Sequence, residues 1–449
     1  MSMKAEQQYI DLFTQYEALV CRESAEALNA PRAKAFADFE RLGFPTRKQE
    51  KYKYTEVGKY FAPDFGLNLN RLEFPVNPYE VFKCDVPNMS TSLYFVVNDS
   101  FDKHVHPSAQ LPEGVLFGSL KEMAEQHPDL VKAYYGKLAD TSKDGLTAFN
   151  TMFAQDGVLM YIPENVVVER PIQLVNILRA DVDSMVNRRL LIIVEAGAQA
   201  KLLVCDHAMD NMNFLSTQVT EVFVGENAVF DLYELEETHD STVRFNQLFV
   251  DQQAGSNALL NGITLHNGTT RNTTEVSLSG RGAEVILCGM AIADKNEQID
   301  NHTFIDHKVP DCTSNELFKY VLDDRAVGAF AGKVLVREGA QHTSSQQTNR
   351  NLCATREARM YTQPQLEIYA DDVKCSHGAT VGQLDENALF YMQQRGIPLK
   401  EARLLLMFAF VGEVIDCIRM DVLKDRLHRL VEKRFRGELN KCQGCAICK

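Results

Sequence analysis

The feature that most constrains the fold of this 449-residue chain is a short glycine motif that recurs every 25 to 30 residues. The pattern Gly-x-x-Ala occupies residues 197–200, 225–228, 255–258 and 280–283. A related string, Val-Arg-Glu-Gly-Ala-Gln-His at residues 336–342, follows about two further periods downstream. A unit of this length cannot bury an apolar face alone, so the repeat predicts coils that stack into one continuous core.

Short runs rich in β-branched residues lie between the repeated glycines. Each coil is therefore expected to supply two or three short strands, and each glycine is expected to mark a corner between them. These features predict a mainly β protein built around a β-solenoid. An ordinary β-sandwich with coincidental glycines is the alternative, and the fixed spacing of the turn signals favours the solenoid.

Both ends of the chain show helical patterns instead of repeats. Residues 33–42 carry apolar side chains three and four positions apart and are followed by Gly43, a typical helix stop. Residues 422–435 form an amphipathic stripe that fits either internal packing or a partner surface. We expect an N-terminal helical region at 1–90, a strand-rich region with the solenoid core at 91–384, with clear repeats from about 168, and a C-terminal helical region at 385–449.

The charge and apolar content of the chain limit its partners. Lys and Arg total 47 against 61 Asp and Glu, which gives a formal net charge of −14 and argues against binding nucleic acid or an anionic membrane. No apolar run is long enough to span a membrane, and the first residues lack the apolar segment of a signal peptide. We therefore expect a cytoplasmic protein whose 11 cysteines are thiols or metal ligands.

The densest group of reactive side chains is the string Asp371-Asp-Val-Lys-Cys-Ser-His-Gly. If this string is a strand, Cys375 and His377 point to the same face, because side chains alternate along a strand. Such a pair suits iron or zinc, or a nucleophile with its base. The alternative is a buried thiol beside a hydrogen-bonded core histidine. The neighbouring carboxylates, Asp371 and Asp372, either orient His377 or cap a coil.

A second polar group lies upstream and consists of Asp300, His302, Asp306 and His307. Two histidines and two aspartates within eight residues are candidate metal ligands. Polar side chains on the outer face of a solenoid are the commoner explanation for such a group.

The C-terminal tail contains Cys442, Cys445 and Cys448 in a Cys-x-x-Cys-x-x-Cys pattern. This spacing is typical of iron–sulfur or zinc ligands, but a complete site needs another ligand from elsewhere. A redox-active or uncommitted tail is the alternative.

Motifs for nucleotide chemistry and hydrolysis are missing from the sequence. Gly328 and Gly332-Lys333 do not have P-loop spacing, and no Ser or Thr follows the lysine. The sequence also contains no Gly-x-Ser-x-Gly elbow and no His-Glu-x-x-His string. We therefore expect no nucleotide site.

Several strings resemble the SufB/SufD family of iron–sulfur cluster assembly proteins. They lie in the run from residue 311 to residue 396, and the long string at 371–382 within it is most similar to the SufD branch. Residues 45–55 are similar to a further family motif, with Tyr52 where tryptophan is usual. The resemblance covers most of the chain.

The resemblance implies a right-handed parallel β-helix in a non-catalytic scaffold subunit. Such a subunit pairs with SufB through the β-helix cores and binds the SufC ATPase through its C-terminal helices, here at about 385–435. A transient iron–sulfur cluster then forms at the SufB interface, where the family histidine corresponds to His377 and lies opposite a SufB cysteine. Cys375 shares the string, but the family gives the cysteine tail no role.

Two other interpretations stay open at this point. One is a SufB-like paralogue that carries the nascent cluster itself. The other is a β-helix enzyme acting on polysaccharides, a class that is usually secreted and uses carboxylates in a cleft. A homodimer in the absence of partners is also left open. A flavin is associated with complexes of this type, but the sequence contains no motif for one.

Overall fold

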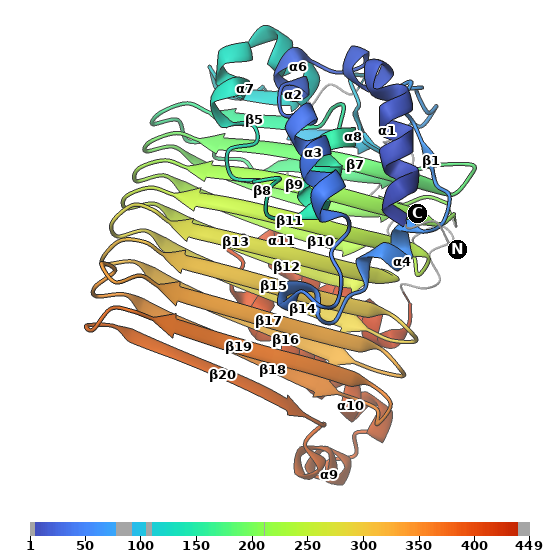
Figure 1. The fold of residues 1–449 in the computed structure, drawn as a ribbon. Coiled ribbons are helices and arrows are strands. Elements are labelled where there is room, and N and C mark those ends of the chain that lie inside the picture. The colour runs from blue at the N-terminus through green and yellow to red at the C-terminus, as the bar shows by residue number, and fades with distance from the viewer. Residues whose placement is uncertain (1–4, 78–91, 105–109, 211, 439–449) are drawn as a thin grey trace.

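The computed structural model describes residues 5–77, 92–104, 110–210 and 212–438. Its centre is a β-solenoid in which the chain passes alternately through two sheets, and successive coils stack into a column (Figure 1). The predicted solenoid is therefore confirmed, and the sandwich alternative is wrong. Helices from both ends of the chain flank the column.

One sheet has ten strands in the order β19-β17-β15-β13-β11-β9-β7-β5-β4, with β1 beside β7. We call it the odd-numbered sheet, because all of its strands except β4 have odd numbers. Their bounds are β1 Gly66–Leu67, β4 Leu116–Ser119, β5 Val158–Ile162, β7 Ser184–Val194, β9 Phe214–Val224, β11 Thr242–Gln252, β13 Thr269–Leu278, β15 Gln298–His307, β17 Val327–Val336 and β19 Arg359–Ile368.

The other sheet also has ten strands, in the order β20-β18-β16-β14-β12-β10-β8-β6-β2-β3. We call it the even-numbered sheet, because all of its strands except β3 have even numbers. Their bounds are β2 Ser92–Val97, β3 Ser100–Phe101, β6 Ile172–Leu178, β8 Gln199–Ala208, β10 Val229–Glu237, β12 Asn257–His266, β14 Glu284–Ala293, β16 Thr313–Leu322, β18 Ser344–Cys353 and β20 Lys374–Gly382.

The repeated glycines occupy corners of the coils for two different reasons. Gly255 has a φ of +64°, a left-handed conformation that disfavours side chains. Gly280 lies so close to the preceding coil that a Cβ atom would stand 1.9 Å from the backbone nitrogen of Ala254. The repeat therefore reports both tight turns and close stacking of neighbouring corners.

The space between the two sheets is filled by a core to which every complete coil contributes. Buried apolar residues such as Ile192, Leu202, Phe230 and Leu260 belong to it. We call the side of each strand that faces this core the inner face. Because neighbouring strands pair in register, each inner position stacks on its equivalent in the next coil and forms a column of side chains.

The N-terminal helices cover the outer face of the odd-numbered sheet (Figure 1). Aromatic residues of this layer, including Tyr9 and Phe149, pack in one cluster with Met185 and Phe245 of the sheet. The bounds are α1 Ala5–Arg22, α2 Glu26–Asn29, α3 Arg32–Leu42, the 3-10 helix η1 Glu50–Tyr52, α4 Val57–Phe61, α6 Leu120–Gln126, α7 Pro128–Tyr134 and α8 Gly145–Phe153.

Helices α10 Leu399–Asp416 and α11 Asp421–Arg436 lie on the opposite side of the column, against the even-numbered sheet (Figure 1). Helix α9 Glu386–Gln394 precedes them and lies beyond β20 at the end of the column (Figure 1). Val411 of α10 and Leu427 of α11 are buried in the same cluster as Met290 of β14. Arg434 of α11 also forms a buried ion pair with Glu297 at 3.1 Å, which ties the last helix to the solenoid. Within the residues that the structure describes, no helix combines the length and apolar character needed to cross a membrane.

Candidate functional site

The string that contains Cys375 and His377 forms β20, the terminal strand of the even-numbered sheet. The terminal strand of the other sheet is β19, so both sheets end at the same end of the column. Most residues of β20 are exposed, and β19 is half-buried to exposed along its length. We call this end, formed by β19 and β20, the open end of the solenoid.

Cys375 and His377 occupy consecutive inner positions of β20, as the alternation of side chains predicts. Cys375 is half-buried and packs against the solenoid core, and burial raises the pKa of its thiol. His377, two residues on, lies on the same face but is exposed to solvent. The structure thus brings an accessible imidazole beside a partly covered thiol at the open end.

The two aspartates lie at the corner between β19 and β20, where both are exposed. The Asp372 carboxylate lies 3.3 Å from Nε2 of His342, on the neighbouring corner. The backbone N–H of His342 donates to the carbonyl of Asp372 at 2.6 Å, and the N–H of Asp372 donates to Oε1 of Gln341 at 2.9 Å. These contacts favour the coil-capping role for Asp372 over the orientation of His377.

His377 is the exposed member of a column that is polar over its last three positions. Pairing in register aligns Glu316 of β16 with Gln347 of β18, and Gln347 with His377 of β20. Nε2 of Gln347 donates to Oε2 of Glu316 at 2.6 Å. Both side chains are buried, and burial raises the pKa of Glu316 to about 7. We call Glu316, Gln347 and His377 the polar column.

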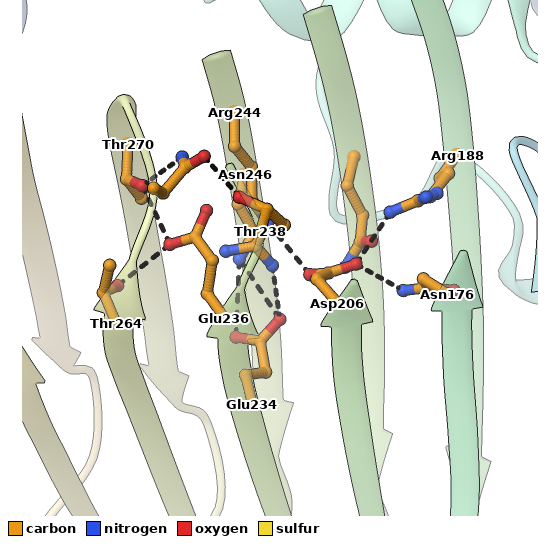
Figure 2. Close-up of polar contacts among 12 residues, drawn as sticks. Asn176, Arg188, Asp206, Glu234, Glu236, Thr238, Arg244, Asn246, Thr264 and Thr270 are labelled. Atoms are coloured by element: carbon orange, nitrogen blue, oxygen red, sulfur yellow. Dashed lines mark hydrogen bonds and ion pairs between the residues drawn. The ribbon is translucent and has the colours of Figure 1, made fainter. Parts of the chain in front are cut away.

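A second polar group is buried deeper in the solenoid, where side chains of both sheets meet (Figure 2). Arg188 of β7 donates to Asp206 of β8 at 2.7 Å, and Arg244 of β11 pairs with Asp206 at 3.2 Å and with Glu234 of β10 at 3.3 Å. Glu236 accepts hydrogen bonds from the hydroxyls of Thr264 and Thr270 at 3.0 and 2.8 Å, and burial raises its pKa to about 7.

The buried residues Glu316 and Gln347, and the buried group in Figure 2, were not predicted from the sequence. One signal was available, because charged residues take alternate positions where the strand pattern calls for apolar ones, as Arg188 does before Leu190 and Ile192. Which strands bring these charges together depends on the register of the coils, and that register is visible only in the structure.

The candidate ligand group at residues 300–307 is divided between the two faces of β15. Asp300, on the outer face, pairs with Arg271 at 2.8 Å and accepts a hydrogen bond from Thr55 at 2.6 Å. His307, on the inner face, is hydrogen-bonded to Ser314 at 2.9 Å. Among the residues that the structure describes, no group of three or more His, Cys, Asp or Glu side chains is arranged to hold a metal ion. The contacts favour a structural role for this group.

The other metal-site prediction concerned the C-terminal tail. Cys442, Cys445 and Cys448 lie outside the described residues, and their proposed role as metal ligands stays a prediction.

The sequence matches two family models that follow one another along the chain. The first is described as the SufBD protein N-terminal region and matches residues 3–174. The second is described as the SUF system FeS cluster assembly, SufBD core domain, and matches residues 176–410, which is more than half of the chain.

Curated relatives agree with these matches over most of their length. An iron–sulfur cluster assembly SufBD family protein of Synechocystis is 28% identical over 402 residues, which cover 88% of this chain and 88% of the relative. The iron–sulfur cluster assembly protein SufD of Escherichia coli is 28% identical over 408 residues, which cover 88% and 90%. SufD of Bacillus subtilis is 25% identical over 366 residues, which cover 78% and 81%. The solenoid, its flanking helices and these matches together show that the chain belongs to the SufBD family of iron–sulfur cluster assembly proteins.

Proposed function

We propose that this protein is a SufD-like scaffold subunit, without catalytic activity of its own, in a complex that assembles iron–sulfur clusters. It pairs with a SufB-like subunit through the open end of the solenoid and with a SufC-like ATPase through its C-terminal helices. The observation that carries this proposal is the placement of the SufD-like string on β20, with His377 exposed at the open end.

The open end has the properties of a surface that another solenoid completes. Terminal strands present backbone N–H and C=O groups that favour pairing with a further strand. Exposed apolar side chains lie along and beside these strands, among them Ile368, Tyr369 and Val381, which are 40%, 63% and 50% exposed. A related subunit that presents two terminal strands of its own would extend both sheets. In the absence of that partner, a second copy of this chain would use the same edges.

The C-terminal helices offer a separate surface for the ATPase. Helices α10 and α11 are fixed to the even-numbered sheet, whereas α9 has no buried residue. Two neighbouring aromatic side chains of α9, Phe390 and Tyr391, are 63% and 59% exposed. ATP hydrolysis belongs to the partner in this proposal, and movement transmitted through these helices exposes the assembly site.

His377 is the residue that meets the nascent cluster, which is the cargo of the complex. An imidazole nitrogen is a good ligand for iron, and Cys375 beside it is a second candidate once its thiol is deprotonated. The partner subunit supplies the remaining ligands across the interface. This division of ligands explains why the chain presents few metal-binding side chains at the open end.

The test replaces His377 with Ala in the reconstituted three-component complex and measures iron and acid-labile sulfide in the assembled cluster. Loss of a ligand is expected to lower cluster formation roughly tenfold or more. Ser376→Ala is the matched control, because Ser376 is also exposed on β20 but lies on the opposite face. Partner binding is measured in parallel, and undiminished assembly by an intact His377→Ala complex would remove His377 from the mechanism.

The chain purified without partners separates this proposal from its rivals. A stoichiometric cluster on the chain purified alone would favour the SufB-like alternative. Degradation of an acidic polysaccharide would favour the β-helix enzyme. The buried carboxylates of Figure 2 are engaged with arginine and threonine side chains inside the solenoid, which is unlike an open catalytic cleft.

A further inference from the structure

We propose that Gln347, held by Glu316, is a positioning residue that orients the imidazole of His377 and selects its tautomer. This inference deepens the proposed function and rests on it for its biological meaning. Its geometry, however, comes entirely from the polar column. Three features of the column carry it: the register of three strands, the donor contact of one buried amide, and the unpartnered acceptor oxygen of that amide.

The register places the three side chains in line. Glu316, Gln347 and His377 are consecutive partners on β16, β18 and β20, and all three lie on the inner face. Neighbouring strands are about 4.8 Å apart, so equivalent side chains stand beside one another within reach of a hydrogen bond. Each neighbouring column on β20 ends in a residue without an imidazole, since Ser345 aligns with Cys375 and Asn349 with Ala379.

The amide of Gln347 has a defined direction. Its Nε2 donates to Glu316 on the β16 side at 2.6 Å, which leaves Oε1 as the atom available to a donor from the β20 side. Oε1 is buried and has no hydrogen-bond partner within the described part of the chain. A buried carbonyl oxygen left unpaired is unfavourable, which favours an inward rotamer of His377 whose ring N–H donates to it.

The surroundings of Gln347 restrict other positions of the amide. A Cβ atom at Gly332, on the opposite sheet, would stand 2.5 Å from Nε2 of Gln347 and 2.9 Å from Oγ1 of Thr303. The amide therefore occupies space that the missing side chain of Gly332 leaves open, and packing against Gly332 and Thr303 limits its movement.

A fixed acceptor has a direct chemical consequence for His377. In a neutral imidazole one nitrogen carries the proton and the other carries the lone pair that binds a metal. Donation of the N–H to Gln347 directs the protonated nitrogen inward and leaves the lone pair facing out of the open end. Partners of this kind orient histidine ligands in metal sites generally.

The test measures the tautomer of His377 by NMR in the full chain labelled with 15N-histidine. Spectra are recorded at about pH 8.5, above the ordinary titration range of imidazoles, and the His377 signals are identified by their loss in His377→Ala. One dominant tautomer is expected in the unmodified chain. In Gln347→Leu the minor tautomer is expected to rise several-fold, toward the mixture typical of a free imidazole.

Asn349→Leu is the matched control, because it removes a buried amide from the same strand while its column ends in Ala379. It should leave the His377 tautomer unchanged. A mixture of tautomers already present in the unmodified chain would overturn the inference, and that outcome does not depend on whether any variant folds. An unchanged tautomer in folded Gln347→Leu would overturn it as well.

Failure of this inference can be distinguished from failure of the proposed function. The NMR measurement needs neither partner nor cluster, whereas the His377→Ala assembly test needs both. A fixed tautomer together with undiminished assembly would sustain the positioning role and remove the assembly role. A mixture of tautomers together with lost assembly would remove the positioning role and sustain the assembly role.

Discussion

The two ends of the solenoid are built in opposite ways. At the first end β4 runs antiparallel to β5, β3 runs antiparallel to β2, and β6 is buried along its whole length. At the open end β20 is almost entirely exposed. Stacked-coil proteins need a polar or covering cap at each end to remain soluble. The first end carries its own cap. At the open end β20 is left uncovered, as the proposed partner interface requires.

One column of the interior changes along the same direction. The column that ends at His377 contains apolar residues such as Leu260 and Leu287 in the middle coils and becomes polar from Glu316 of β16 onward. In this column hydrogen bonds replace apolar packing toward the open end. We therefore expect stability to be concentrated in the middle and first coils, and the proposed function at the last one.

The largest expected effect tests where that stability lies. Phe230→Ala, at a fully buried core position, should lower the free energy of unfolding by about 3–5 kcal/mol. Val381→Ala at the open end should change it by less than about 0.5 kcal/mol, because Val381 is half exposed. Urea unfolding followed by circular dichroism measures both. Equal losses in the free energy of unfolding would contradict the proposed difference in stability between the interior and the open end.

The second prediction concerns pH and the buried carboxyl of Glu316. Burial raises its pKa from 4.5 to about 7, so the folded chain favours the protonated form. Its contribution to stability is complete below about pH 4.5 and is lost as the pH rises through about 7. At about 1.4 kcal/mol per pKa unit, that loss is about 3 kcal/mol. Glu316→Gln should therefore be more stable than the parent chain at about pH 8, and the two should converge near pH 4.5.

A matched substitution sharpens this prediction. The pKa of Glu236 is also raised to about 7 by burial, and this net shift already includes the opposing effect of Arg244. Glu236→Gln should therefore gain about as much stability between pH 4.5 and pH 8 as Glu316→Gln. Unfolding curves across the pH range measure both variants, and a pH-dependent gain at only one of them would contradict this account of the two carboxyls.

The third prediction separates partner binding from folding. Val381→Lys should weaken binding to the SufB-like partner roughly tenfold or more, because a charged lysine on a terminal strand opposes pairing with another strand. The stability of the isolated chain should not change. Val182→Lys is the control, since Val182 is 63% exposed at a corner of an early coil. Affinity is measured by calorimetry, and equal weakening by both variants would show that the open end is not the interface.

The smallest expected effect concerns the corner beside β20. Asp372→Asn removes the exposed carboxylate beside His342, a contact worth about 1 kcal/mol or less. Stability and cluster formation should both stay close to those of the parent chain if Asp372 only caps the coil. A marked loss of cluster formation at unchanged stability would restore the alternative in which this carboxylate orients His377.

Local sequence patterns correctly predicted the solenoid and the helices that flank it. The glycine repeat predicted stacked coils because tight corners and close contacts between coils constrain single residues such as Gly255 and Gly280. The charged pairs inside the column were not predicted. Arg188 and Asp206 lie on different sheets, and their contact depends on how the chain turns between β7 and β8. A short sequence pattern carries little information about such a contact.

The sequence alone determined that Cys375 and His377 share a face, because alternation along a strand is a property of neighbouring residues. Only the tertiary structure decided that this face belongs to a terminal strand, that His377 is exposed and that Gln347 and Glu316 lie behind it. Those three facts depend on the register between coils about 30 residues apart in the chain. That register is chosen by the packing of the whole core and not by any local string.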